Sequence, residues 1–318
     1  MSPTPDPTRT TSVRSWSGRL LPRPHDDVED QGLAFDVQTV LNRRSILRGF
    51  GVGAVGVALV ACGTDADPDT VDSASAATDA GTGTGTGTGE IPDETAGPYP
   101  GDGSNGPDVL EESGIVRSDI RSSIGDGSAT AEGVPMTLEL AVSDLADGGS
   151  AMAGAAVYVW HCDRDGLYSM YSDGVEDENY LRGVQVADDD GVVRFTSIFP
   201  ACYAGRWPHV HFEVYPDEAG VADSANAIAT SQVALPQAVC AKVYATTGYE
   251  QSVGNLAQLS LSTDNVFGDD GGASQLATVT GDVDRGYRVA LPVRVDTTTA
   301  PTGGAGGPGG APPSRPAG

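Results

Sequence analysis

The residues of this chain best suited to metal chemistry are two tyrosines and two histidines. Tyr168 occurs in D-G-L-Y-S, Tyr203 follows P-A-C, and His209 and His211 form an H-V-H pair. The chain has only four histidines, so two of them one residue apart and shortly after a tyrosine favour a shared role. On a β-strand, residues i and i+2 face the same side about 7 Å apart, which lets both imidazoles reach one ion. The grouping predicts a metal site.

The tyrosines decide which metal this set favours. Imidazole alone suits zinc, copper, iron or nickel. A phenolate is a hard anionic oxygen donor that prefers a small, highly charged cation, as in the tyrosine ligation of catalase haem iron. Two phenolates and two neutral imidazoles leave Fe(III) with one net positive charge, which a bound hydroxide can cancel. The set therefore predicts non-haem ferric iron.

Other interpretations of the same residues stay open. An H-V-H pair on an apolar strand is, taken alone, more often two ordinary hydrogen-bonding histidines. A single tyrosine is more often a core or rim aromatic with a satisfied hydroxyl. The joint spacing favours a site over these readings, while a copper or zinc site on the H-V-H pair remains an alternative to iron.

Three longer stretches around these residues resemble the intradiol ring-cleavage dioxygenases, which include the catechol and protocatechuate dioxygenases. They read V-Y-V-W-H-C-D-R-D-G-L-Y-S, Y-L-R-G-V-Q-V-A-D-D-D-G-V-V-R-F and I-F-P-A-C-Y-A-G-R-W-P-H-V-H-F. The resemblance covers about Ile91 to Val295. It implies that ferric iron is held by Tyr168 as the equatorial tyrosinate, Tyr203 as the axial one, and His209 and His211.

The resemblance also assigns residues around the metal. Arg206 matches the arginine that precedes the histidines. The segment E-T-A-G-P-Y resembles the wall of the substrate pocket in protocatechuate-type members, which places Pro98 and Tyr99 in that wall. The sequence T-S-Q resembles the family's T-x-Q and would put Gln232 near the iron.

The implied reaction inserts both atoms of O2 into a catechol ring and opens it between the two hydroxylated carbons, which gives a cis,cis-muconate. A catechol bound through both oxygens displaces Tyr203, whose phenolate takes a substrate proton as a general base. Arg206 stabilises the negative charge that develops on the substrate. The structural alternative for Arg206 is an ion pair with a carboxylate.

The elements that must position these residues are β-strands. Met136, Leu138, Leu140 and Val142 alternate with polar or small residues, which is typical of a half-buried strand. Short strands separated by turn signals predict an all-β, Greek-key sandwich over residues 91–296, and the resemblance implies the same fold with ligands on loops and strand ends. Further strands are expected at Ala155–Trp160, Gly183–Ala187, Val192–Ile198, Val210–Tyr215, Ser231–Leu235, Leu276–Gly281 and Tyr287–Val295, with a short helix at Pro236–Ala245.

The two ends of the chain are expected to lie outside this domain. Residues 1–62 resemble a twin-arginine signal that ends in a lipobox, L-V-A-C-G, with Cys62 as the lipidated residue. The alternative is an ordinary cleaved signal with a chance cysteine. Residues 63–90 predict a flexible linker and residues 297–318 a disordered Pro/Gly-rich tail. We therefore expect an exported cell-surface or periplasmic lipoprotein, or a secreted protein if Cys62 is not lipidated.

The charge of the chain limits its partners. It carries 44 acidic and 18 basic side chains, a net charge of −26, which argues against nucleic acid and anionic membrane surfaces. The expected partners are a small catechol and O2, with membrane contact only through the N-terminal lipid. No helical dimerisation region like that of the catechol dioxygenases precedes Ile91, and the oligomeric state stays open. A non-catalytic binding module on the same sandwich is the rival function.

Three cysteines remain after the lipobox, and export favours one disulfide with one thiol left over. Cys162 with Cys240 is the expected pair, and Cys202, next to a proposed ligand, is the alternative partner or a buried thiol. A zinc site from His161, Cys162 and Cys202 lacks a recognisable zinc spacing. His161 is expected to pack beside Trp160.

Overall fold

The computed structural model describes residues 15–16, 19–20 and 89–302. The chain divides into two units, Met1–Ser75 and Ala76–Gly318. In the first unit, β1 (Ser15–Trp16) pairs antiparallel with β2 (Arg19–Leu20). The expected lipobox, almost all of the expected linker and the tail from residue 303 lie outside the described residues. Across the described part of the chain, no helix has the length and apolar character to cross a membrane.

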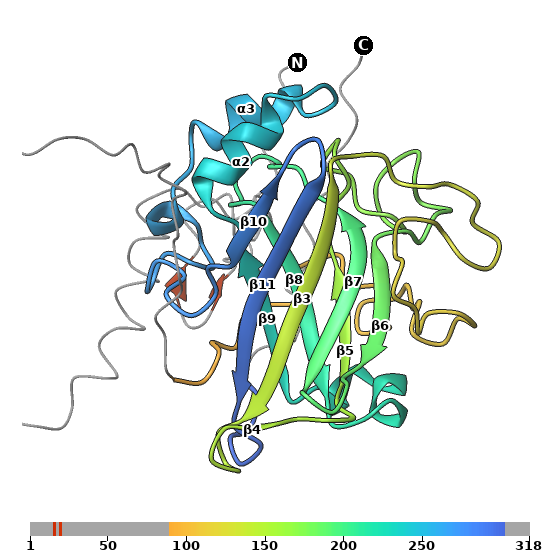
Figure 1. Ribbon diagram of the computed structural model, residues 1–318, viewed down its shortest axis with the longest axis vertical. Coiled ribbons are helices and arrows are strands. Elements are labelled where there is room, and N and C mark those ends of the chain that lie inside the picture. The colour runs from red at the N-terminus through yellow and green to blue at the C-terminus, as the bar shows by residue number, and fades with distance from the viewer. Residues whose placement is uncertain (1–14, 17–18, 21–88, 303–318) are drawn as a thin grey trace, which may run out of the picture. The chain divides into compact units, whose positions relative to one another are not determined.

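The second unit consists of two β-sheets packed face to face (Figure 1). One sheet has the order β10-β11-β3, with β4 and β7 both pairing with β3, and its β3 and β11 run parallel. The other has the antiparallel order β6-β5-β8-β9. The strands are β3 (Pro135–Asp144), β4 (Ser150–Ala151), β5 (Ala156–Trp160), β6 (Arg182–Val186), β7 (Val192–Ile198), β8 (His209–Tyr215), β9 (Ala229–Ala234), β10 (Thr278–Asp282) and β11 (Gly286–Val295).

The predicted all-β sandwich is confirmed. The chain crosses between the sheets repeatedly, from β4 to β5, from β6 to β7, from β7 to β8 and from β9 to β10. Each predicted strand appears with ends shifted by no more than two residues, whereas the short β4 was not predicted.

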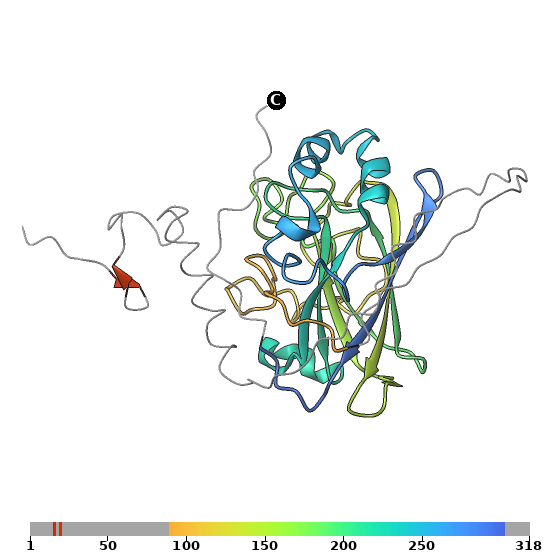
Figure 2. The same ribbon diagram turned by 90° about the vertical axis from the view of Figure 1, so that its left-hand side faces the viewer.

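The two sheets differ in how their faces are covered. In β3 and β11, buried and exposed side chains alternate, because one face meets the core and the other meets solvent. In β5, β8 and β9 every side chain is buried. The second face of their sheet lies under the chain between Ala96 and Ile115, drawn in orange to yellow in Figure 2. This covered face is the one that carries His211.

Apolar side chains fill the space between the sheets. They form one cluster to which both inner faces contribute. Its members include Leu138, Leu140, Val157, Val159, Phe195, Phe212, Val214, Val289 and Leu291.

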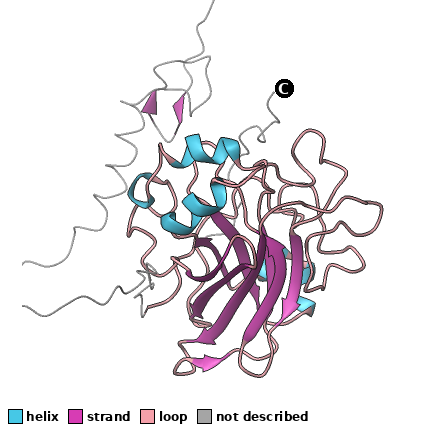
Figure 3. Ribbon diagram, turned by 45° about the horizontal axis from the view of Figure 1, so that its top comes forward, coloured by secondary structure: helices cyan, strands magenta, loops and turns pink. Residues whose placement is uncertain are grey.

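Two α-helices, α2 (Gln237–Tyr244) and α3 (Glu250–Leu256), lie at one end of the sandwich (Figure 3). Helix α2 begins directly after Pro236, close to the prediction. Helix α3 was not predicted, and it holds the loop before β8: Ser252 Oγ accepts from the Cys202 amide at 2.9 Å and Asn255 Nδ2 donates to the Cys202 carbonyl at 2.8 Å. Within residues 89–302, 3-10 turns also occur at Ala219–Ala222, Ser224–Asn226 and Leu261–Thr263.

The predicted disulfide between Cys162 and Cys240 is wrong, because both cysteines and Cys202 are free, buried thiols. Cys162 follows β5 and packs in the cluster on the covered face, where its sulfur lies 3.7 Å from the carbonyl of Ala201. Cys240 lies on α2 and packs in the cluster between the sheets. The two side chains therefore belong to different packed layers.

The ends of the described domain are hydrogen-bonded to its sheets. The Ile91 amide donates to the carbonyl of Arg294 at 2.7 Å. Beyond β11, Thr297 Oγ1 donates to Asp144 Oδ2 at 2.7 Å, and the Thr302 amide donates to Asp93 Oδ2 at 2.6 Å.

Candidate metal centre

The structure brings Tyr168, Tyr203, His209 and His211 together at one point. Tyr168 lies in the loop between β5 and β6, Tyr203 in the loop between β7 and β8, and both histidines on β8. Tyr168, His209 and His211 are buried, whereas Tyr203 is half-buried. Four side chains from three segments thus meet at one point, and only Tyr203 among them is partly exposed to solvent.

The four donor atoms lie at the spacing of ligands to a single ion. The Tyr168 hydroxyl is 3.5 Å from that of Tyr203, 3.5 Å from His209 Nε2 and 3.4 Å from His211 Nε2. The Tyr203 hydroxyl is 3.3 Å from His209 Nε2, and the two Nε2 atoms are 3.0 Å apart. Two atoms each about 2.1 Å from one ion lie about 3.0 Å apart at a right angle and about 3.4 Å apart at a tetrahedral angle.

Both imidazoles are fixed with Nε2 toward this point. His209 Nδ1 is hydrogen-bonded to the carbonyl of Trp207. A carbonyl only accepts, so Nδ1 carries the hydrogen and Nε2 keeps its lone pair, as in most histidines that bind metals. The His211 ring stacks on Trp160 with the centroids 4.9 Å apart and the planes 6° apart. Stacking fixes this ring, since His211 Nδ1 has no hydrogen-bond partner among residues 89–302.

The surroundings keep the imidazoles neutral and the phenols protonated. Burial, and then the charge of Arg206, lowers the pKa of His209, and burial lowers the pKa of His211 well below its usual range. Burial raises the pKa of Tyr168 well above its usual range, and it raises that of Tyr203 to about 12 although Arg206 acts in the opposite direction. Four converging neutral donors are suited to a cation, whose charge would hold the phenols as tyrosinates.

Hydrogen bonds fix the loop that carries Tyr168. Asp163 Oδ1 accepts from the amides of Asp165 and Leu167, both at 2.9 Å, and the Tyr180 hydroxyl donates to Asp163 Oδ2 at 3.0 Å. The Tyr168 amide itself donates to Ser172 Oγ at 3.0 Å. The D-R-D-G-L-Y stretch is thus a carboxylate-centred turn that presents the tyrosine.

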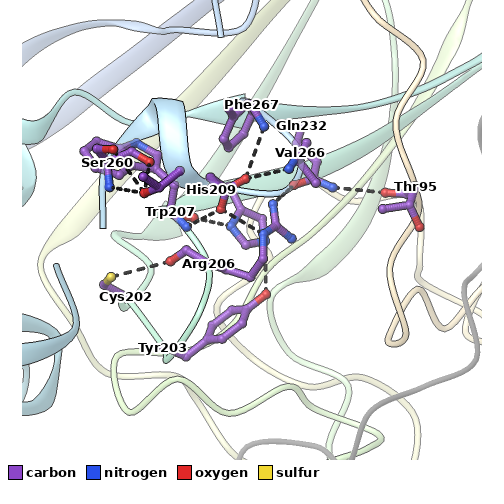
Figure 4. Close-up of polar contacts among 12 residues, drawn as sticks. Thr95, Cys202, Tyr203, Arg206, Trp207, His209, Gln232, Ser260, Val266 and Phe267 are labelled. Carbon is purple, nitrogen blue, oxygen red and sulfur yellow. Dashed lines mark hydrogen bonds and ion pairs between the residues drawn. The ribbon is translucent and has the colours of Figure 1, made fainter. Parts of the chain in front are cut away.

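Arg206 lies beside the metal centre and is held from two sides (Figure 4). Its Nε donates to Asp264 Oδ2 at 3.0 Å, and its Nη2 donates to Gln232 Oε1 at 2.6 Å. Gln232 Nε2 in turn donates to the carbonyl of Thr95 at 3.0 Å. Burial alone would lower the pKa of Arg206, but Tyr203 and Asp264 raise it. Arg206 therefore makes the ion pair that was the structural alternative for it, and it also stays next to Tyr203.

The expected substrate wall packs against the ligands. Gly97, at φ +73°, lies so close to His211 that a Cβ there would be 3.3 Å from its Cε1. The Tyr99 ring is 5.0 Å from that of Tyr168. The carbonyl of Pro98 accepts from Asn105 Nδ2 at 2.8 Å. The wall segment is thus in contact with the metal centre through Gly97 and Tyr99.

The alternative zinc ligands are engaged elsewhere. His161 Nδ1 is 2.7 Å from the carbonyl of Cys162, and its Nε2 is 2.7 Å from Ser197 Oγ. Burial lowers the pKa of His161 to about 4 and raises that of Cys162 well above its usual range. Both nitrogens of His161 already have partners, so it has the bonding of a buried structural histidine.

Sequence reasoning missed two residues of the site. Asp264 lies 58 positions after Arg206, and its Oδ2 also accepts from the Trp207 amide at 2.7 Å. Trp160 was assigned to a strand but not to the site. Trp160 could have been assigned to the site from the pairing of the strands, because its backbone pairs with that of His211 between β5 and β8. No sequence pattern marks Asp264.

Comparisons with known proteins agree with this geometry. A family model described as dioxygenase matches residues 105–221, which include the two tyrosines and two histidines of the centre. The chlorocatechol 1,2-dioxygenase of Rhodococcus opacus is 33% identical over 89 residues, which are 24% of this chain and 35% of that protein. The chlorocatechol 1,2-dioxygenase of Pseudomonas putida is 36% identical over 89 residues, 22% of this chain and 34% of that protein. The match thus spans about a third of the length of these curated relatives.

A solved structure has a similar fold over two thirds of this chain. An intradiol ring-cleavage dioxygenase from Tetranychus urticae superposes with a TM-score of 0.53 at 22% identity, covering 67% of this chain and 98% of that one. The solved structure and this chain share the β-sandwich fold. The chain is thus similar to the dioxygenase family over residues 105–221 and to an intradiol ring-cleavage dioxygenase in its fold.

Proposed function

We propose that this protein is a non-haem Fe(III) dioxygenase that adds both atoms of O2 to a catechol and cleaves the ring between its hydroxylated carbons, giving a cis,cis-muconate-type product. The observation that carries the proposal is the convergence of two phenol oxygens and two imidazole nitrogens, 3.0 to 3.5 Å apart, beside Arg206. Two anionic oxygen donors favour ferric iron over the divalent ions that imidazole alone would suit.

Tyr168, Tyr203, His209 and His211 would hold the iron. Ferric iron, when bound, supplies a Lewis acid that draws electron density from a coordinated catecholate and makes its ring reactive toward dioxygen. Tyr168 is buried and anchored through Ser172, which suits a permanent ligand. Tyr203 is half-buried, which suits the ligand that leaves and takes a proton from a substrate hydroxyl.

Arg206 supplies positive charge at the position where the substrate becomes anionic. Its guanidinium is oriented by Asp264 and Gln232 before any substrate binds, so no reorganisation is needed during the reaction. It lies close enough to Tyr203 to lower the pKa of that phenol. The same charge that favours the tyrosinate therefore favours an incoming catecholate.

The test is to load the purified protein with ferric iron and to measure oxygen uptake with catechol, chlorocatechols, hydroxyquinol and protocatechuate. We expect a red-brown protein, from tyrosinate-to-iron charge transfer, and a muconate-type product with one O2 consumed per catechol. Zinc-loaded protein is the matched control and should be colourless and inactive. A colourless iron-loaded protein would reject the ferric site, and a coloured protein without oxygen uptake on any catechol would favour a binding module.

We also propose that the protein is exported by the twin-arginine route and anchored by a lipid on Cys62. The support is the motif around Arg43 and Arg44 together with the L-V-A-C-G sequence. Changing both arginines to lysine should retain the protein in the cytoplasm, whereas Cys62→Ala should release an exported protein from the membrane fraction. Unchanged fractionation of both variants would reject the proposal.

A further inference from the structure

Arg182, the first residue of β6, is a buried cation that makes only neutral contacts. Its side chain is 1% exposed, and within residues 89–302 it forms no ion pair. A buried charge that forms no direct ion pair lowers the stability of a fold unless hydrogen bonds compensate it. The position of Arg182 therefore needs a reason other than pairing.

The guanidinium joins two segments that are far apart in sequence. On one side, Nη1 donates to the carbonyl of Pro100 at 2.5 Å and Nη2 donates to the carbonyl of Tyr99 at 2.9 Å. On the other side, Nη2 donates to the carbonyl of Ser169 at 2.9 Å and Nε donates to Ser169 Oγ at 3.1 Å. The first segment is the end of the expected substrate wall, Tyr99, with the residue that follows it, and the second is the loop that carries Tyr168.

The backbone on both sides of this contact is strained. Met170, at φ 70°, and Leu181, at φ 58°, are the non-glycine residues with positive φ in the described part of the chain. One directly follows Ser169, and the other directly precedes Arg182. Non-glycine residues in the left-handed region cost about 1 kcal/mol or more and persist where surrounding structure imposes them, which is common at functional sites.

Gly101, two residues after the expected wall, leaves room for the guanidinium. A Cβ on Gly101, at φ +66°, would lie 2.8 Å from Arg182 Nη1 and 3.1 Å from Met170 Sδ. The amide of Gly101 donates to the Tyr171 hydroxyl at 2.8 Å, and the Tyr171 ring centroid lies 5.5 Å from the Arg182 guanidinium carbon. A larger residue at position 101 would displace the arginine or the wall.

We propose that Arg182 is a positioning residue that locks the end of the expected substrate wall onto the Tyr168 loop and so fixes where the wall lies beside the candidate metal centre. This inference rests on the proposed function for the nature of the bound substrate. Arg182 touches no donor atom of the centre. Its planar fork of five N–H groups spans both segments at once, which a lysine ammonium on a flexible stem does not do.

Arg182→Met and Arg182→Lys test the proposal, with Arg194→Met as the matched control. Arg194 lies on the neighbouring strand in sequence, β7, where its exposed side chain pairs with Glu139 and Asp188. In metal-free protein, we expect amide exchange over residues 98–103 to accelerate at least tenfold in both Arg182 variants and to stay at the wild-type rate in Arg194→Met. This measurement does not depend on activity.

The kinetic measurement uses iron-loaded protein and the catechol that wild type turns over best. Both Arg182 variants should raise KM at least tenfold while kcat falls less than threefold, because the wall is released from the Tyr168 loop but the candidate ligands remain. Wild-type exchange and KM in Arg182→Lys would overturn the proposal by showing that charge suffices. Loss of thermal stability with unchanged exchange over 98–103 and unchanged KM would overturn it by showing a purely structural role.

Gly101→Ala provides a second variant that leaves Arg182 in place but crowds it. Gly148→Ala is its control, since Gly148 has φ +65° and open space around a Cβ. We expect faster exchange over 98–103 and a raised KM only in Gly101→Ala, and equal behaviour of the two alanine variants contradicts the proposal. Absence of catechol turnover in wild type would reject the proposed function. The amide-exchange measurements would still show whether Arg182 holds residues 98–103 in place.

Discussion

Tyr168 and Tyr203 carry the same phenol but differ in what surrounds them. Tyr168 is buried among aromatic rings, with Tyr99 at 5.0 Å and Tyr203 at 5.8 Å between centroids. Tyr203 is half-buried, and burial raises its pKa to about 12 against the opposing charge of Arg206, whereas burial and the neighbouring Tyr203 raise the pKa of Tyr168 well above its usual range. Equivalent ligand atoms therefore have unequal freedom to move and to exchange a proton.

Replacing each tyrosine by phenylalanine should separate these roles. Tyr168→Phe should weaken ferric iron binding by at least about 10- to 100-fold, the cost typical of disturbing the groups that hold a metal. Tyr203→Phe should retain iron but lose kcat by about 100-fold, the lower range for a missing general base. Iron titration followed by the visible charge-transfer band, together with oxygen uptake, measures both.

Tyr287→Phe is the control for these substitutions, because Tyr287 is a buried tyrosine of β11 that packs on Phe199, away from the metal centre. It should leave iron affinity and kcat within about twofold of wild type. Normal turnover in Tyr168→Phe would refute its assignment as a ligand.

Asp264 orients Arg206, so Asp264→Asn should reduce kcat/KM about tenfold without loss of iron. The asparagine introduced at position 264 keeps an oxygen that can accept from the backbone amides of Val266 and Phe267. It has no negative charge to pair with Arg206. Asp282→Asn, in an exposed pair with Arg285 at 3.9 Å, is the control and should leave kcat/KM unchanged. Full activity in Asp264→Asn would show that Gln232 alone orients Arg206.

The same pair predicts how stability depends on pH. Burial alone would raise the pKa of Asp264, but Arg206 and the amides of Trp207 and Val266 outweigh it and hold the pKa below the ordinary 3.8. A lowered folded-state pKa gives stability that is present above pH 3.8 and is lost as the pH falls through the lower folded value. Urea unfolding should therefore show the wild type losing its advantage over Asp264→Asn below about pH 4. A constant difference between the two proteins from pH 7 to pH 2 would contradict this assignment.

At the scale of elements, the strands were predictable because their pattern is local. Alternation in β3 and the H-V-H pair in β8 follow from the two-residue period, and the structure places both imidazoles on one face. The resemblance placed Pro98 and Tyr99 beside the site, but the covering of that face by the other residues between Ala96 and Ile115 was not predictable, since it joins segments that are far apart in sequence. The same limit explains the missed Arg206–Asp264 pair and the wrong Cys162–Cys240 disulfide.

The covering segment should be most sensitive where it touches a ligand. Gly97→Ala places a Cβ 3.3 Å from His211 Cε1 at φ +73°, whereas Gly154→Ala places one in open space at φ +85°. Both substitutions cost backbone strain of about 1 kcal/mol, but only the first displaces the wall from the metal centre. Gly97→Ala should therefore lower kcat/KM about tenfold beyond Gly154→Ala at equal thermal stability. Equal kcat/KM in the two variants would show that the wall does not bound the reaction site.

At the scale of the whole molecule, the charge of the chain acts on its substrates. A net charge of −26 repels anions over distances set by ionic strength. The acidic character extends to the wall, where burial and the neighbouring Asp269 and Asp270 raise the pKa of Glu94 to about 7. Arg206 is a positive charge at the candidate metal centre. An anionic substrate must therefore approach it against the repulsion of the acidic protein.

The kcat/KM for an anionic catechol should therefore depend on salt concentration, whereas the kcat/KM for a neutral catechol should not. Protocatechuate carries a carboxylate at neutral pH, and raising ionic strength from about 10 mM to 150 mM shortens the Debye length from about 30 Å to 8 Å. We expect its kcat/KM to rise about 3- to 10-fold over this range, because screening removes repulsion during encounter. Catechol, assayed in the same buffers at pH 8, where Glu94 is ionised, serves as the uncharged control and should change by less than about twofold. Parallel salt profiles for the two substrates would show that the field of the molecule does not reach the metal centre, and selection among catechols would then rest on the contacts of the wall alone.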